Sequence, residues 1–360
     1  MYFKEIELKN FRNYTDQKVE FDPKLNLIMG DNAQGKTNLL EALFIMGLGK
    51  SFKTNNDKEM IMFGFDFARA SSVVVNEDGE ETSIEIIYSK EGKVIKVDGV
   101  KLLRNVDLLE NVYVVVFSPE DLRIVKDGPD QRRRFLDREL CQIKPVYYSD
   151  LGNYKKILKQ RNYLLREQCR DKNLFEVFDE SLSEYGFRIV KERKSFIKRL
   201  QLICSDIHKS ISNGLEDLSI TYETSTESKE QLKEKLRQNF DSDLMKGYTS
   251  FGPHKDFLGI WINGKDSRIY GSQGQQRTAS LSMKLAEIEL IKQETGHNAV
   301  LLLDDVLSEL DSRRQKYLIE TMKDVQIFVS ATGMEEELKK MLPKGNIYIV
   351  DKGKVNLYNR

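Results

Sequence analysis

Cysteine, histidine and tryptophan are scarce in this chain, which carries three, three and one of them among 360 residues. The cysteines, Cys141, Cys169 and Cys204, are isolated and odd in number, and no CxxC pair occurs. This usage excludes a disulfide framework and a cysteine zinc site. The scattered histidines argue equally against a zinc site built from imidazoles. We therefore expect three reduced thiols, as in proteins of the cytosol.

Net charge and long apolar runs are also missing. Lysine plus arginine and aspartate plus glutamate number 57 each, so any nucleic-acid binding must come from local basic patches. No apolar run approaches the ~18 residues that span a membrane. The N-terminus MYFKEIELKNFRNY is charged and alternating, unlike a signal peptide. With 40% hydrophobic and 32% charged residues, the composition is that of a charge-rich globular protein.

Three stretches of different character follow one another along the chain. Residues 1–125 alternate or run apolar, with glycine turns such as those in EDGE and VDG, and predict strands with one or two helices. Residues 126–245 have a helical period, and residues 246–360 return to strands and helices. We predict one α/β domain, built around a phosphate-loop helix and split by an inserted helical arm.

Two apolar stripes run through the predicted arm. The first comprises Tyr147, Leu151, Tyr154, Leu158 and Leu165, and the second runs in three- and four-residue steps from Phe175 to Ile207. Such spacing places the side chains on one face of a helix, and we assign them to core packing. The arm is therefore predicted to be a helical hairpin or a small bundle.

A glycine-rich loop stands between a predicted buried strand and a predicted helix. Gly30, Gly35, Lys36 and Thr37 match the phosphate-loop pattern GxxxxGK[ST] in the right context. Backbone N–H groups and the helix start would hold phosphates, Lys36 would reach the β- and γ-phosphates, and Thr37 would contact Mg²⁺. The predicted nucleotide-binding residues are Gly30, Asp31, Asn32, Ala33, Gln34, Gly35, Lys36, Thr37 and Asn38. A guanine-reading NKxD loop is absent, which argues against a GTPase.

An acidic pair ends the apolar run AVLLLDD far down the chain. Adjacent carboxylates after four buried residues are costly unless a metal ion or other partner compensates them. Asp304 is suited to coordinate Mg²⁺, and Asp305 is suited to orient or activate the attacking water. The alternative is an ordinary strand end with solvated aspartates.

The run YGSQGQQRTASL, residues 270–281, would be a simple turn if it stood alone. Its order after the phosphate loop and before the acidic pair resembles ABC-type ATPase heads, and most closely the SMC-like DNA-repair ATPases of the RecF family. The stretches that carry the resemblance are NFRNY (10–14), GDNAQGKTNLLEA (30–42), GKSFKT (49–54), FSPEDLRIVKDGPDQRRRFLD (117–137), GPHKDFL (252–258), YGSQGQQRTASLSMKLAE (270–287) and LLLDDVLSELD (301–311).

The resemblance implies that ATP is bound between two chains. Ser272 of one copy would contact the γ-phosphate held by the other, and SELD (308–311) would line the seam. The further residues that the resemblance implies for nucleotide binding are Gly274, Gln275, Arg12 and Asn13, the last two beside the adenosine. Glu120 would sense the metal or the water, and Lys36, Ser272, Glu120 and Asp305 form the predicted catalytic set.

Three departures from the resembled pattern stand out. Asp305 replaces the glutamate of many transporter heads, and its shorter reach would suit slow hydrolysis. Transporter heads use a histidine after the last core strand. This sequence has no histidine there, which leaves Ser330 or Thr332 as candidates for the role of that histidine. Phe257 stands where the family usually has a second aspartate, and this side chain cannot supply the carboxylate of that acid.

As to function, the resemblance implies an ATP-dependent DNA-binding protein of recombinational repair in the cytoplasm, associated with the nucleoid. An ATP-dependent homodimer would clamp duplex DNA near gaps or single-strand/double-strand junctions. With the mediators RecR and RecO it would promote RecA loading, and a weak DNA-stimulated ATPase would reset it. The alternatives are an SMC-like chromosome protein, for which the arm is short, and a transporter ATPase subunit, which the arm fits poorly.

Basic residues that could contact DNA phosphates occur in two of these stretches. They are Lys50 and Lys53 in GKSFKT and Arg132, Arg133 and Arg134 in DQRRRFLD. Phosphate contacts require positive charge without a spacing code, so the sequence cannot rank them. The arginine trio could equally hold the arm together through internal ion pairs.

Overall fold

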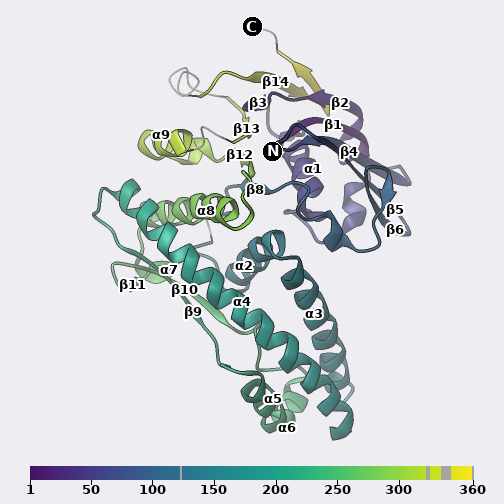
Figure 1. Cartoon of the computed structure of the whole chain (residues 1–360), viewed down its shortest axis with the longest axis vertical. Coiled ribbons are helices and arrows are strands. Elements are labelled where there is room, and N and C mark those ends of the chain that lie inside the picture. Colours follow the sequence, from purple (N-terminus) through teal and green to yellow (C-terminus); the bar gives the residue numbers. More distant parts are fainter. Residues whose placement is uncertain (122–123, 322–324, 334–341, 359–360) are drawn as a thin grey trace. The chain divides into compact units, whose positions relative to one another are not determined.

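The computed structural model describes residues 1–121, 124–321, 325–333 and 342–358. Leu122 and Arg123 of the 117–137 stretch therefore lie outside the described residues. The chain divides into two compact units, Met1–Leu122 with Leu281–Arg360, and Arg123–Ser280. Both ends of the chain thus build the first unit, and the middle builds the second (Figure 1). Within the described ranges, no helix has the length and apolar character needed to cross a bilayer.

The first sheet of the first unit is antiparallel, with the order β2-β1-β4-β5-β6-β7. Its strands are β1 (Tyr2–Phe11), β2 (Tyr14–Glu20), β4 (Phe67–Val75), β5 (Glu81–Ser89), β6 (Gly92–Val97) and β7 (Val100–Lys101). Buried and more exposed side chains alternate along β4 and β5, as expected for strands with one face on a core. The strands predicted for this region, with glycine turns at Gly79 and Gly99, are confirmed.

The second sheet has the order β15-β14-β3-β13-β12-β8 and is parallel except for β15. Its strands are β3 (Leu25–Met29), β8 (Val114–Phe117), β12 (Val300–Asp304), β13 (Ile327–Ala331), β14 (Asn346–Asp351) and β15 (Lys354–Leu357). The strands β8, β12 and β13 are buried along their whole length, which explains their continuous apolar sequences. Because β3, β12 and β13 are parallel neighbours, their carboxyl ends meet at one edge.

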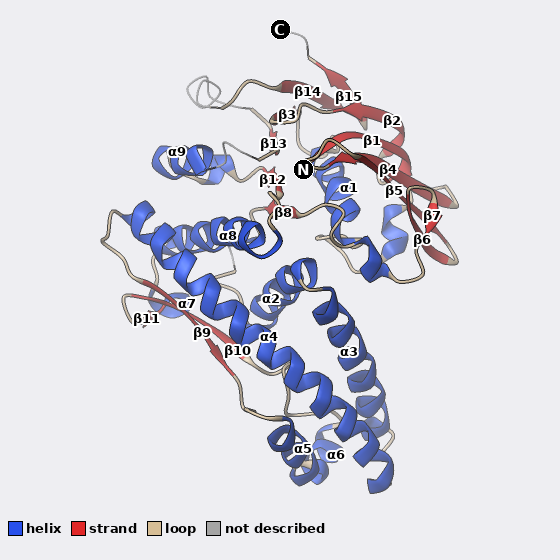
Figure 2. Ribbon diagram, in the orientation of Figure 1, coloured by secondary structure: helices blue, strands red, loops and turns tan. Residues whose placement is uncertain are grey.

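Helix α1 (Lys36–Leu48) packs against strands of both sheets. It is apolar on nearly every side, and its residues join those of both sheets in one core. Figure 2 shows α1 beside the strands of these sheets. Among the described residues, this unit also contains α9 (Ser312–Thr321) and the 3₁₀ helices η1 (Asp57–Met60), η2 (Asn105–Leu108) and η4 (Leu307–Glu309).

The second unit contains the long helices α2 (Pro129–Ile143), α3 (Pro145–Arg166) and α4 (Lys172–Ser212), and the short helices α5 (Lys229–Gln238), α6 (Phe240–Lys246) and α7 (Ser267–Tyr270). It also holds the sheet β11-β10-β9, made of β9 (Leu218–Glu223), β10 (Phe257–Ile262) and β11 (Lys265–Asp266). Helix α8 (Gln273–Thr295) begins in this unit and ends in the first.

One predicted boundary requires correction. The sequence predicts that the chain leaves the arm at residue 246, whereas the second unit continues to Ser280. The reason is the ladder between β9 and β10, because β9 follows α4 and needs a partner strand for its backbone groups. The α/β fold class with an inserted arm is confirmed, but the arm is not wholly helical.

Most residues of the predicted stripes of the arm are buried, and the half-buried ones are Leu158, Phe178, Tyr185, Ile203 and Ile207. The sequence did not predict that charged side chains share these faces. Arg161 is completely buried and donates to Asp179 at 2.8 Å and to Asp243 at 2.9 Å. A buried charge needs such partners, so these ion pairs join α3, α4 and α6 specifically.

Candidate nucleotide-binding site

The loop between β3 and α1 depends on two glycines. Gly30 has φ 154° and Gly35 has φ 124°, values that side-chain-bearing residues rarely adopt. A Cβ on Gly30 would lie 2.3 Å from the carbonyl oxygen of Val350, and one on Gly35 would lie 2.6 Å from Nδ2 of Asn13. Both positions therefore require glycine for conformation and for space.

Lys36 is buried at the start of α1 and folds back over this loop. Its ammonium donates to the carbonyl oxygens of Gly30 at 2.9 Å and Asp31 at 3.1 Å. A cation is thus held at the helix N-terminus, where the backbone dipoles already favour an anion. The arrangement suits the phosphates of a nucleotide.

Thr37 and Asp304 meet although they lie on different elements. The Thr37 hydroxyl donates to Oδ1 of Asp304 at 2.9 Å, and the Ser330 hydroxyl donates to the same oxygen at 2.8 Å. Burial raises the pKa of Asp304, while the hydrogen bonds from Ser330 and Thr37 oppose this rise. A hydroxyl and a buried carboxylate at one point form an oxygen donor set that a hard cation prefers.

Asp305, the next residue, has φ 52°, in the left-handed region. Its amide donates to the Ser330 hydroxyl at 3.0 Å, so Ser330 holds both members of the acidic pair. Within the described residues the Asp305 carboxylate makes no hydrogen bond or ion pair, and the residue is half-buried. Of the two candidates for the missing histidine, only Ser330 contacts the pair, whereas Thr332 is exposed.

The turn at residues 12–14 braces the phosphate loop. Arg12 binds Glu41 of α1 through two hydrogen bonds, of 2.9 and 2.8 Å. Asn13 donates to the carbonyl oxygen of Gln34 at 2.7 Å, and the Tyr14 hydroxyl donates to that of Gly35 at 2.9 Å. Arg12 and Asn13 therefore stand beside the loop, and Tyr14 is a support that the sequence did not reveal.

A second brace comes from the turn between β14 and β15. The amide of Lys352 donates to Oε1 of Gln34 at 2.7 Å, and the amide of Gly353 donates to its carbonyl oxygen at 3.1 Å. No local pattern links Gln34 to a turn more than three hundred residues away. Only the pairing of β14 with β3 brings the two together.

Lys53 and Lys50 differ in their surroundings. Lys53 donates to Oδ1 of Asn38 at 3.2 Å, and its charge opposes the raised pKa of Asp304. It therefore belongs to the surroundings of the phosphate loop. Lys50 is exposed on the segment that follows α1.

Glu120 is exposed at the end of the β8 segment. Its neighbour Asp121 is buried and accepts hydrogen bonds from the Ser118 amide at 3.0 Å and the Ser118 hydroxyl at 2.9 Å. Asp121 thus fixes the turn that presents Glu120. In the described part of the chain, no three histidine, cysteine or acidic side chains cluster to form a metal site by themselves.

In the second unit, Ser272 caps helix α8. Its hydroxyl accepts from the Gln275 amide at 3.2 Å, and Oε1 of Gln275 accepts from the Ser272 amide at 2.9 Å. These reciprocal bonds form a capping box, which the spacing S-x-x-Q encodes. Ser272 is exposed, Gly274 follows in the first turn, and Ile269 and Tyr270 beside them are 68% and 69% exposed.

The predicted arginine trio divides into three environments. Arg132 is buried and donates to the carbonyl oxygens of Leu258 and Val125, so it cannot contact DNA, and that prediction is wrong. Its guanidinium also lies 5.6 Å from the ring centre of Phe257. Arg133 is committed to the Asp256 carbonyl and to Asp130. Arg134 is exposed.

Comparison with known proteins adds to this geometry. A family model described as the RecF/RecN/SMC N terminal domain matches residues 2–355. The DNA replication and repair protein RecF of Clostridium botulinum (strain ATCC 19397 / Type A) is 44% identical over 362 residues, 99% of each chain. The protein of the same name from Alkaliphilus oremlandii (strain OhILAs) is 44% identical over 367 residues, covering 99% of this chain and all of the relative.

Solved structures are similar as well. One is that of the recombination mediator protein RecF with ATP in the RecFOR pathway, with a TM-score of 0.91, 40% identity, and coverage of 99% of this chain and 98% of the other. The Smc head domain of Pyrococcus furiosus matches with a TM-score of 0.55 and 17% identity, over 99% of this chain and 96% of the other. The second likeness concerns the fold alone.

Proposed function

Because the chain belongs to the RecF family of SMC-like ATPases, we propose that it is an ATP-dependent DNA-binding protein of recombinational repair. ATP closes two copies of the chain around duplex DNA near gaps, and slow hydrolysis reopens them. The observation that carries this proposal is the meeting of Thr37, Asp304 and Ser330 beside a glycine loop. Relatives named as DNA replication and repair proteins, and RecF with ATP bound, support it.

The residues of the first unit fit a nucleotide with Mg²⁺. Lys36 and the loop amides would hold the phosphates, and Thr37 and Asp304 would hold the ion. With few protein ligands, the ion would keep water and phosphate oxygens in its shell, as Mg²⁺ prefers. When bound, it neutralises charge on the β- and γ-phosphates. Arg12 and Asn13 would lie beside the adenosine.

Asp305 is proposed to orient the attacking water. Its carboxylate has no hydrogen bond or ion pair with any residue that the structure describes, and its left-handed backbone is a local strain of the kind that accumulates at functional sites. An aspartate reaches less far than a glutamate, which fits a slow, switch-like, DNA-stimulated ATPase. Glu120, exposed beside the buried Asp121, would sense the ion or the water.

The second half of the site would come from another copy of the chain. Ser272, Gly274 and Gln275 at the start of α8 would supply donors to its γ-phosphate. Exposed Ile269 and Tyr270 beside them support burial at a seam, because large apolar side chains gain from leaving water. ATP would then shift a monomer–dimer equilibrium, since it binds the dimer better than the monomer.

The partners of this switch are proposed to be duplex DNA, including gapped and junction DNA, and the mediators RecR and RecO. Together they would promote loading of RecA. The neutral overall charge means that DNA contacts depend on local side chains, of which Lys50 is an exposed example. Action on the nucleoid in the cytoplasm follows from this role.

Light scattering of an Asp305→Ala protein tests the switch. This variant keeps Lys36, Thr37 and Asp304 and therefore should bind ATP without hydrolysing it. We expect the dimer fraction to rise with ATP and not with ADP, whereas Lys36→Ala should stay monomeric under both conditions. Equal dimer content with and without ATP in Asp305→Ala would refute the proposal.

A further inference from the structure

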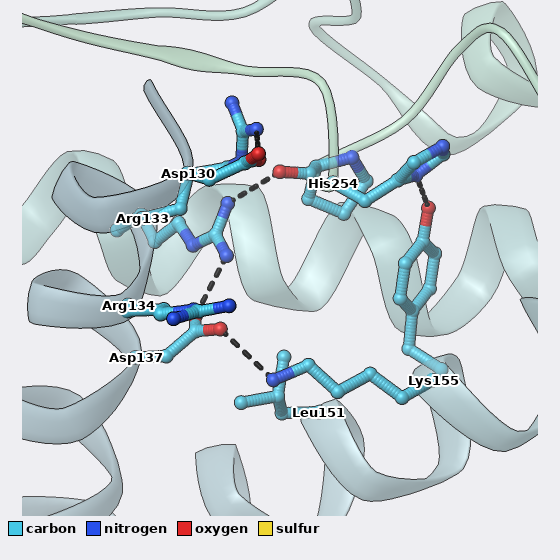
Figure 3. Close-up of a pocket in the computed structure, with 10 residues that line it drawn as sticks. Asp130, Arg133, Arg134, Asp137, Leu151, Lys155 and His254 are labelled. Carbon is cyan, nitrogen blue, oxygen red and sulfur yellow. Dashed lines mark hydrogen bonds and ion pairs between the residues drawn. The ribbon is translucent and has the colours of Figure 1, made fainter. Parts of the chain in front are cut away.

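A pocket of about 370 Å³ lies wholly within the second unit. Its wall comes from α2, α3, α4 and the turn at Pro253 and His254 (Figure 3). The size is at the lower end of the range of ligand pockets, about 300–1,000 Å³. Two stretches that carry the family resemblance, 117–137 and 252–258, meet here, yet the ATPase cycle uses neither the pocket nor its residues.

The inner wall is a closed hydrogen-bond network. Buried Arg193 donates to Asp137 at 2.7 Å, to the Pro253 carbonyl at 2.7 Å and to the Tyr147 hydroxyl at 3.0 Å. Asp137 also accepts from Lys155 at 3.1 Å. Burial alone would raise the pKa of Asp137, but Arg193 and Lys155 outweigh it and the pKa is lowered. Arg193 and Asp137 therefore neutralise each other and form a rigid base.

The turn of the GPHKDFL stretch completes this wall. Nδ1 of His254 is hydrogen-bonded to the Tyr154 hydroxyl at 2.6 Å, and its Nε2 is hydrogen-bonded to the carbonyl oxygen of Thr249 at 3.0 Å. Burial lowers the pKa of His254 to about 4, so the ring is neutral near pH 7. A neutral imidazole ring forms both hydrogen bonds when its Nε2–H donates to the Thr249 carbonyl and its Nδ1 accepts from the Tyr154 hydroxyl.

The mouth of the pocket, by contrast, carries cations with spare donors. Arg134 is exposed and makes no hydrogen bond or ion pair with any residue that the structure describes. Lys155 has a side chain that is 60% exposed, with Asp137 its one ion-pair partner in the described ranges. Since Arg133 pairs with Asp130, the excess positive charge lies on Arg134 and Lys155.

The shape and charge favour a single acidic side chain over a DNA backbone. Duplex DNA is a long row of phosphates, and proteins meet it with cations spread along a surface. Here the two spare cations, Arg134 and Lys155, lie in the lining of one recess. A guanidinium fork matches a carboxylate, and buried Leu151 and Pro253 offer an apolar wall for its stem.

We propose that this pocket is the docking site for a glutamate or aspartate side chain of a protein partner, with Arg134 and Lys155 binding the carboxylate. The sequence made Arg134 a candidate for contacting DNA phosphates, whereas this proposal assigns it a carboxylate of a protein partner. The inference rests on the proposed function, in that the partners to be tested are the mediators named there. Arg193, Asp137 and His254 act as positioning residues that hold the recess open.

The test compares Arg134→Glu and Lys155→Glu with the wild-type chain in calorimetric titrations against purified RecR-type and RecO-type mediators of the same organism. Lys159→Glu is the matched control, because it reverses an exposed charge on α3 outside the pocket. We expect mediator binding to weaken at least about tenfold in the two pocket variants, the usual effect of reversing one charge-assisted contact. Lys159→Glu should bind like the wild type, and circular dichroism should show all variants folded.

The readouts separate this inference from the proposed function. If the wild type binds a mediator and the pocket variants bind it equally well, the inference is wrong and the proposed function stands. If the variants instead lose duplex DNA affinity with a smaller salt dependence, the pocket holds a DNA phosphate and the inference is also wrong. A wild type that binds neither mediator would overturn the partner assignment together with this site. ATP-driven dimerisation should be unchanged in every variant.

Discussion

The hydroxyl of Thr37 donates a 2.9 Å hydrogen bond to Asp304, and this bond joins residues 267 positions apart. Thr37 stands at the start of α1 and Asp304 at the end of β12, so the contact links the phosphate loop to the acidic pair. Ser330, at the end of β13, completes the group. The parallel order β3-β13-β12 explains it, because three strand ends open onto one edge.

Asp304→Asn tests this group directly. Asparagine keeps an oxygen that accepts from Thr37 and Ser330, so the thermal stability should stay close to that of the wild type. It removes the charge that would hold Mg²⁺, and we expect ATP turnover to fall by about 100-fold or more. Steady-state phosphate release measures this. Turnover within a few-fold of the wild type would show that Asp304 is not the metal ligand.

Gly30→Ala should damage the loop. The new Cβ would lie 2.3 Å from the Val350 carbonyl, and φ 154° would be strained. We expect a loss of about 1–3 kcal/mol in the free energy of unfolding, together with loss of ATP binding, measured by urea titration and by fluorescent-nucleotide binding. Gly79→Ala is the control, since Gly79 has φ 83° but open space around it. Gly79→Ala should lose free energy of unfolding only through its strained φ, and it should bind ATP like the wild type.

Ser272 has a structural role as well as the proposed one, and two substitutions separate them. Ser272→Asp keeps an N-cap acceptor for the Gln275 amide, whereas Ser272→Ala should lose about 1 kcal/mol of stability. If Ser272 faces the γ-phosphate of another copy, the added negative charge of Ser272→Asp should abolish ATP-driven dimerisation. Ser272→Arg should do the same by bulk. Both should leave ATP binding by the monomer intact, and persistence of the ATP-bound dimer in either would contradict the assignment.

His254 makes the stability of the chain depend on pH. Burial lowers its pKa to about 4. In the unfolded chain it is near 6.5, so between these values only the unfolded state binds the proton. The contribution of His254 is therefore fully present above about pH 6.5 and is lost as the pH falls toward 4, by up to about 3 kcal/mol.

Urea unfolding at pH 7.5 and 5.0 measures this loss. His254→Gln has no titrating group at this position, so its stability should fall less between the two pH values than that of the wild type. Buried carboxylates nearby titrate in both proteins and cancel in the comparison. The same pH dependence in both proteins would mean that His254 is not the source.

The residues proposed for the nucleotide site could be named from the sequence because each belongs to a local pattern. The glycines, Lys36 and Thr37 lie within eight consecutive residues, and the spacing of such a loop follows from the backbone that must surround phosphates. Asp304 and Asp305 follow a continuous apolar strand, where two carboxylates have few structural uses. The capping box at Ser272 and Gln275 is also a local pattern, because it depends on the spacing S-x-x-Q.

What lay beyond prediction depends on contacts between distant segments. Arg132 and Arg134 are two residues apart and identical in type, yet one faces the core under Phe257 and the other faces water. A helix turns through about 100° per residue, so only the tertiary packing decides which arginine is buried. The boundary at Ser280 arose in the same way, from the pairing of β10 with β9.

The sequence by itself therefore determined the family, the α/β class and the identity of the phosphate-loop and acidic-pair residues, because short-range spacing carries that information. The tertiary structure decided that Ser330 joins Asp304 and Asp305, that the β14–β15 turn holds Gln34, and that Arg134 and Lys155 share one recess. These relations depend on strand order and helix packing, in which residues far apart in sequence are brought together by the burial of a common core.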